Sequence, residues 1–111
     1  MKNKVYTISL FEVRYKRLVK KFPSLAQEII ELQNQLIENP EIGVKLTANI
    51  YKIRIPNKDN QRGKSGGFRV ITYLIEEWED CHQINLITIY DKSEESTMTK
   101  TEVLKILKKY F

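Results

Sequence analysis

The sequence has little of the chemistry that metal sites and many hydrolases require. Its 111 residues include one cysteine and one histidine, the neighbours Cys81 and His82. A single cysteine cannot form an intramolecular disulfide, and this pair offers no metal-ligand spacing, so we expect neither a metal nor another cofactor. Both residues follow four acidic side chains in an expected hairpin turn. We interpret them as surface positions and exclude Ser-His-Asp and Cys-His catalysis.

Long apolar runs are also missing. No run approaches the roughly 20 residues that cross a bilayer, and Met1-Lys2-Asn3-Lys4 leads into an alternating segment instead of a secretory signal. A cytoplasmic protein without membrane association is expected. Leu, Ile, Val and Phe nevertheless make up 34 of the 111 residues, well above the roughly 20% below which a charged chain tends to stay disordered. One folded domain over residues 1–111 is therefore expected.

Charge is unevenly distributed along the chain, whose net charge is +5. Residues 1–21 carry seven basic and one acidic side chain and residues 50–73 carry six and one, whereas residues 74–98 carry one and seven. Clustered Lys and Arg favour a polyanionic partner, RNA or DNA first and an acidic protein second. A solvated surface is the alternative explanation of the same charges.

Apolar spacing predicts a strand and two helices in the N-terminal part. Residues 4–9 alternate as a strand does, and residues 11–22 place their apolar side chains on one helical face. Pro23-Ser24 interrupts that pattern, and the spacing of Ser24 and Gln27 predicts a capping box at the start of a second helix. Asn39-Pro40 ends this helix. The two helices should form a hairpin.

Three strands and a helix are expected in the remainder. The strands cover residues 50–55, 67–75 and 84–90, separated by turn formers at 57–66 and by acidic residues at 76–80. Thr99 and Glu102 have the spacing of a capping box at the start of a last helix. The order β-α-α-β-β-β-α predicts an α+β domain with a small antiparallel sheet, an N-terminal helical hairpin and a C-terminal helix.

Basic side chains gather on the expected strands and on the loops that join them. Antiparallel pairing would bring five of these cations into one positive concavity: Lys52, Arg54, Lys64, Arg69 and Lys92. Between the expected strands 50–55 and 67–75, glycines would let the backbone approach a phosphate closely, although the segment lacks the order of a Walker loop. The expected RNA-binding residues there are Arg62, Lys64, Ser65, Gly66 and Gly67. A hairpin tip without function is the alternative.

The chain resembles a known family over nearly its whole length. Tyr51–Ile55, Gly63–Ile71 and Ile89–Glu94 are similar to segments of the RelE/HigB toxins of bacterial type II toxin–antitoxin systems. RelE itself has an arginine after the lysine that corresponds to Lys92 and a tyrosine near the start of its last helix, whereas here Ser93 follows Lys92 and no tyrosine lies between residues 98 and 107. Toxins of the HigB type share the Tyr-x-Lys-Ser-Glu-like segment, so the HigB type is the better comparison. The resemblance implies a RelE-like fold and a metal-independent endoribonuclease. Such a toxin cleaves mRNA on the ribosome, inhibits translation and is held inactive by a cognate antitoxin protein.

By motif position, the resemblance places Lys52, Arg54 and Arg69 on the basic active-site positions of the family. RNA supplies its own nucleophile, the 2′-hydroxyl, so the enzyme must align it, move two protons and stabilise the phosphorane. Arg69 is the first candidate for the phosphate clamp and Arg54 the second, because a guanidinium donates two parallel hydrogen bonds to phosphoryl oxygens. Lys52 or Lys92 could transfer protons or only attract RNA, and Tyr90 is a candidate for base stacking or proton transfer.

Two other functions remain open at this point. A ParE-like toxin of the same fold would inhibit DNA gyrase and need no catalytic cluster, and the basic loop argues mildly against it. A non-catalytic RNA-binding module would explain the charge without any catalytic geometry.

Overall fold

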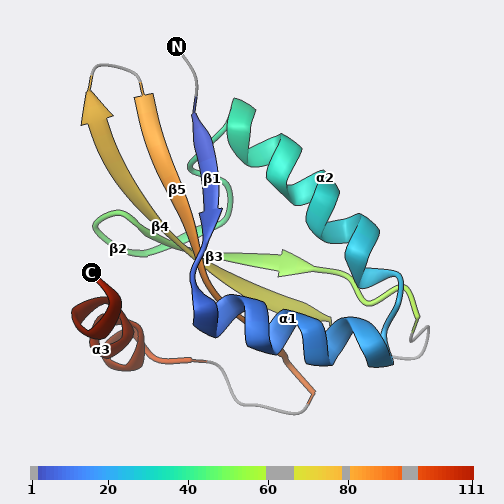
Figure 1. Ribbon diagram of the computed structural model, residues 1–111. Coiled ribbons are helices and arrows are strands. Elements are labelled where there is room, and N and C mark those ends of the chain that lie inside the picture. Colours follow the sequence, from blue (N-terminus) through green and yellow to red (C-terminus); the bar gives the residue numbers. More distant parts are fainter. Residues whose placement is uncertain (1–2, 60–66, 79–80, 94–97) are drawn as a thin grey trace.

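The computed structural model describes residues 3–59, 67–78, 81–93 and 98–111 (Figure 1). It is an α+β fold, as predicted, in which three helices pack against a five-stranded sheet. The elements are β1 (Lys4–Thr7), α1 (Ser9–Lys21), α2 (Leu25–Glu38), β2 (Val44–Thr47), β3 (Ile50–Ile55), β4 (Phe68–Trp78), β5 (Cys81–Asp91) and α3 (Lys100–Tyr110). The predicted order is confirmed apart from β2, which was not expected.

The sheet is mixed, whereas the sequence pattern predicted an antiparallel one. Its strand order is β1-β5-β4-β3-β2. β5, β4, β3 and β2 pair antiparallel, but β1 pairs parallel with β5 at the edge. Alternation reveals which residues share a face but not the direction of a strand relative to a partner far away in the sequence. The orientation of β1 was therefore wrong in the prediction.

The additional strand β2 is short and lies at the other edge of the sheet. It pairs antiparallel with β3 and connects to it through Ala48 and Asn49, where Asn49 has a φ of 66°. Asparagine tolerates this left-handed conformation better than most residues. Val44 and Leu46 alternate with Lys45, and this weak signal followed by a turn residue could have revealed the strand.

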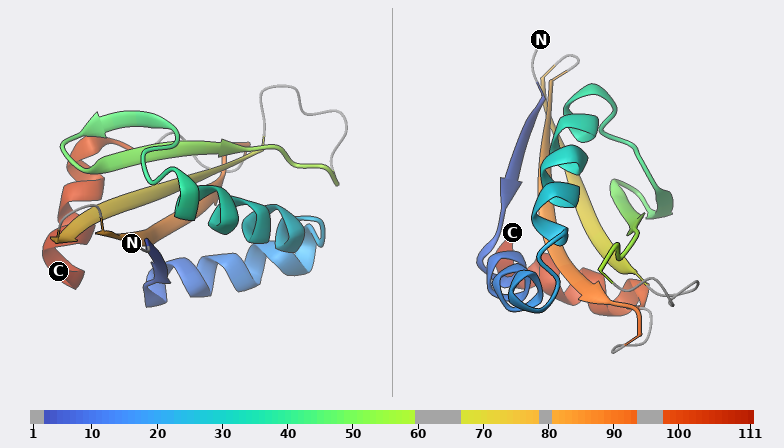
Figure 2. Two further views of the ribbon diagram at one scale, coloured as in Figure 1. Left: turned by 90° about the horizontal axis from the view of Figure 1, so that it is seen from above. Right: turned by 90° about the vertical axis from the view of Figure 1, so that its right-hand side faces the viewer.

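Helices cover the two faces of the sheet unequally. Apolar side chains of α1 and α2, such as Phe11, Leu18 and Leu32, form the larger core with Ile53 and Val70 of the sheet. On the opposite face, a smaller cluster joins Val103 of α3 to Ile50, Ile71 and Ile87. Figure 2 shows α1 and α2 together, with α3 apart from them. None of the helices in the described residues combines the length and the hydropathy that a membrane-spanning helix needs.

The hairpin between β4 and β5 extends further than predicted. β4 continues to Trp78 and β5 begins at Cys81, so part of the acidic segment 76–80 belongs to a strand. Cys81 is buried and His82 is half-buried, which corrects their interpretation as surface residues of a turn. The pairing of a long two-stranded ladder overrode the turn signal of the acidic residues.

The two predicted capping boxes have different outcomes. At α2, the Ser24 side chain makes no capping bond. Its backbone N–H and its hydroxyl both donate to Asp59 Oδ2 at 2.8 Å, so a distant acceptor replaces the local one and that prediction was wrong. At α3, Thr99 N donates to Glu102 Oε1 at 2.9 Å and Glu102 N donates to Thr99 Oγ1 at 3.2 Å, which confirms the second box.

Thr99→Ala should lower the free energy of unfolding by about 1 kcal/mol, because the first turn of α3 loses its side-chain acceptor. Hydrogen bonds from the backbone and side chain of Thr99 hold the pKa of Glu102 below its ordinary value. The contribution of that carboxylate is therefore present above its unfolded pKa and disappears as the pH falls through the folded one. Urea denaturation should show the difference at pH 7 and a smaller difference in acid. Thr101→Ala, an exposed change in the same turn, is the control and should be close to neutral.

Candidate functional site

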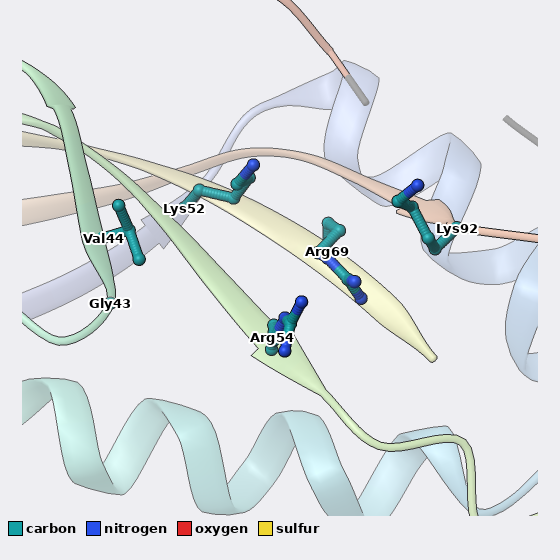
Figure 3. Close-up of a pocket in the computed structure, with 6 residues that line it drawn as sticks. All are labelled: Gly43, Val44, Lys52, Arg54, Arg69 and Lys92. Atoms are coloured by element: carbon teal, nitrogen blue, oxygen red, sulfur yellow. The ribbon is translucent and has the colours of Figure 1, made fainter. Parts of the chain in front are cut away.

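Four cationic side chains converge on one pocket of about 420 Å³. Figure 3 shows them reaching it from β3, from β4 and from the turn after β5, with the start of β2 forming another wall. We call this site the cation pocket, and its lining residues are Gly43, Val44, Lys52, Arg54, Arg69 and Lys92. None of these described lining residues is acidic.

The register of the sheet explains this convergence. Arg54 of β3 lies directly opposite Arg69 of β4, and Val44 of β2 lies opposite Lys52. Lys52 and Arg54 alternate with residues that are buried under α1 and α2, so both point to the face on which α3 packs. The smaller apolar cluster of α3 includes none of the pocket residues. The cations therefore occupy a part of this face outside that cluster.

The cations differ in their exposure. Arg54 is exposed, and Lys52 and Lys92 are half-buried, whereas Arg69 is only 4% exposed. Its Nη1 donates to the carbonyl of Phe68 at 3.3 Å, and burial with hydrogen bonds limits the rotamers that its side chain can adopt. Four positive groups on the walls of one concavity raise the local potential and attract anions. The arrangement suits a phosphate, because guanidinium groups can bind two of its oxygens at once.

The turn that carries Lys92 is held by its neighbours. Lys92 N donates to the carbonyl of Gly67 at 3.0 Å. The Asp91 carboxylate accepts hydrogen bonds from the backbone N–H and the hydroxyl of Ser93, at 2.9 and 2.8 Å. The backbone on both sides of Lys92 is thus fixed.

Gly67, one of the expected RNA-binding residues, has a structural role at the start of β4. It is buried, has a φ of +84°, and a Cβ added there would lie 2.6 Å from the carbonyl oxygen of Ile55. Only glycine fits this conformation and this close approach. Gly67 therefore positions the start of β4 and, through its carbonyl, Lys92.

Gly43 and Val44 are the pocket residues that the sequence reasoning missed. Gly43 has a φ of +104°, and an added Cβ would lie 2.5 Å from the carbonyl oxygen of Lys52. The glycine lets β2 begin close against β3 and brings Val44, which is 64% exposed, to the pocket wall. In the sequence, the isolated glycine before an alternating segment could have indicated a close backbone approach at the start of β2.

Not all of the predicted catalytic residues line the cation pocket. Lys52, Arg54, Arg69 and Lys92 line the pocket. Tyr90 does not contribute to the described lining, because its side chain is fully buried and its hydroxyl accepts a hydrogen bond from Met98 N at 3.2 Å. We therefore leave it out of the catalytic set. The other predicted RNA-binding residues, Arg62, Lys64, Ser65 and Gly66, lie outside the described residues.

No family model matches the sequence. Among the residues that the structure describes, no group of three or more His, Cys, Asp or Glu side chains is placed to hold a metal ion.

Gly43→Ala should destabilise the protein by more than about 1 kcal/mol, because alanine is strained at this φ and its Cβ collides with the Lys52 carbonyl. Asn49→Gly, at the other end of β2, is the contrasting control: glycine adopts its positive φ without strain, so the change should be nearly neutral. Urea denaturation of both variants measures the difference. Equal stability of the two would contradict the close approach of β2 to β3.

Proposed function

We propose that this protein is a toxin of the RelE/HigB type, a cytoplasmic endoribonuclease that cleaves mRNA on the ribosome and thereby inhibits translation. The observation that carries the proposal is the cation pocket, where two arginines and two lysines from β3, β4 and the turn after β5 face the same space. The resemblance of the strand and turn segments that bear them to these toxins supports the same function.

Each part of the pocket has a task in this reaction. Arg54 and Arg69 bind the scissile phosphate and stabilise the charge that develops on the phosphorane. Lys52 and Lys92 are the candidates for removing the proton of the 2′-hydroxyl and for protonating the leaving oxygen. Val44 offers an apolar contact to the sugar or base beside that phosphate.

The proposed step uses the nucleophile of the substrate. The 2′-oxygen forms a bond to phosphorus while the bond from phosphorus to the 5′-oxygen breaks. One proton passes from the 2′-hydroxyl to the lysine that acts as general base, and the lysine that acts as general acid gives one proton to the 5′-oxygen. The products are a 2′,3′-cyclic phosphate and a 5′-hydroxyl, and no water or redox partner is consumed.

Arg54→Ala is the cleanest test of phosphate binding, because Arg54 is the exposed arginine of the pocket. With about four phosphates neutralised, a plot of the logarithm of affinity for an uncleavable 2′-deoxy strand against the logarithm of salt concentration should have a slope near −3. The variant should make this slope less negative by about 0.7. Lys45→Ala is the matched control. It removes the same charge from the neighbouring strand, but Lys45 lies opposite Tyr51 and so belongs to the other face. A slope near zero for the unmutated protein would remove the phosphate site.

Three assays separate the candidate functions: cleavage of ribosome-bound message, binding of intact RNA and inhibition of DNA supercoiling. Products with a cyclic phosphate support the ribonuclease, tight binding of intact RNA supports a non-catalytic module, and inhibited DNA supercoiling supports a gyrase inhibitor. Arg54→Ala should reduce cleavage at least tenfold, and Lys45→Ala should leave it unchanged. Excess chelator should not stop the reaction on free RNA, since the proposed step uses no metal.

A nuclease of this kind would damage its own cell, so the proposal includes a cognate antitoxin. An acidic, partly disordered segment that folds on the toxin and covers its cations is the economical inhibitor. Expression of this protein alone should arrest bacterial growth, and co-expression of the antitoxin, expected in a small neighbouring reading frame, should restore it. Harmless expression in bacteria that lack such a partner would contradict the toxin assignment.

A further inference from the structure

The turn after β5 is built by the two neighbours of Lys92. We infer that Asp91 and Ser93 are positioning residues, which act on RNA through Lys92 by fixing its backbone at the edge of the cation pocket. The inference rests on the proposed function, since it assumes that Lys92 contacts the RNA.

The geometry of Asp91 carries the inference. Its side chain is only 3% exposed, and one oxygen, Oδ1, accepts from both the N–H and the hydroxyl of Ser93. A carboxylate that bonds the backbone two residues further on closes a tight turn, and Asp and Asn are favoured in turns for this reason. The residue enclosed by this turn is Lys92.

A second anchor is Gly67, the residue just before the neighbouring strand β4. Gly67 accepts the hydrogen bond of Lys92 N, and the backbone of Gly67 is itself packed against Ile55. Lys92 is therefore held to β4 on one side and by the Asp91 turn on the other.

Lys92 needs this support more than the other cations do. Lys52, Arg54 and Arg69 belong to strands whose pairing fixes their backbones, whereas Lys92 lies just beyond the end of β5. A lysine on a loose turn would lose backbone as well as side-chain freedom on binding, which lowers affinity. Fixing the backbone before the ligand arrives removes that part of the cost.

The experiment measures affinity for a 2′-deoxy strand that cannot be cleaved. Ser93→Ala removes only the hydroxyl bond and should weaken binding by about fivefold, the usual scale of one lost hydrogen bond. Asp91→Ala removes both bonds and should weaken binding by at least as much. Asp91→Asn should bind almost as tightly as the unmutated protein, because asparagine keeps the Oδ1 acceptor. If Asp91 acted through its negative charge, the asparagine and alanine variants would instead behave alike, and the inference would be wrong.

A double-mutant cycle with Lys92→Ala tests whether the two residues act through Lys92. In the Lys92→Ala background, Ser93→Ala should have no further effect on affinity. An equal fivefold loss with and without Lys92 would mean that Ser93 acts independently of Lys92, which overturns the inference. Because Ser93 is exposed, its alanine variant should fold even if Asp91→Ala does not, and thermal melting checks this.

Asn39→Ala is the matched control for disruption of a turn. Asn39 Oδ1 accepts from the N–H of Glu41, also two residues on, at 3.2 Å, and neither residue lines the cation pocket. Its RNA affinity should be unchanged.

If the unmutated protein does not bind RNA, the proposed function fails, and the same cycle is then run with inorganic tripolyphosphate. Coupling between Ser93 and Lys92 would support the positioning role independently of RNA. Absence of coupling, or of any binding, would overturn it.

Discussion

The register of β3, β4 and β5 is the constraint on which the site depends. Successive residues of a strand point to opposite faces, so each strand that carries a pocket cation also carries apolar residues for the core under α1 and α2. A slip of one residue would bury Lys52 and Arg54 and expose Ile53. The rows Ile53–Val70–Ile89 and Arg54–Arg69–Tyr90 run next to each other across the sheet. Core formation therefore selects the pairing that also gathers the cations.

Like charges in one pocket repel one another, and the fold holds them together through contacts made elsewhere. The apolar rows beneath the strands supply the stabilisation, while the two glycines permit close backbone approaches at the pocket margins. An anion that binds only the folded protein adds stability by mass action, about 2.7 kcal/mol at one hundred times its dissociation constant. Ligand occupancy and folding are coupled for this reason.

The sequence predicted most of the fold, because helical stripes and strand alternation are local signals. Alternation also placed Lys52 and Arg54 together, and antiparallel pairing predicted their convergence with Arg69. It could not predict the parallel direction of β1 or the bond from Ser24 to Asp59, since both depend on partners far away in the chain. Tyr90 shows the same limit: its register beside Arg69 favours a role in the site, but its side chain is fully buried and its hydroxyl accepts a hydrogen bond from Met98 N.

The parallel pairing of β1 with β5 has a consequence for synthesis on the ribosome. β1 emerges before the other described elements, yet its partner β5 spans Cys81–Asp91 and is made only after two helices and three further strands. The loop that this pairing closes contains α1, α2 and three strands, and such non-local contacts slow folding. Lys92, which follows β5 directly, is the last pocket cation to be translated. A nascent chain therefore cannot assemble the cation pocket until β5 and the turn after it have been made.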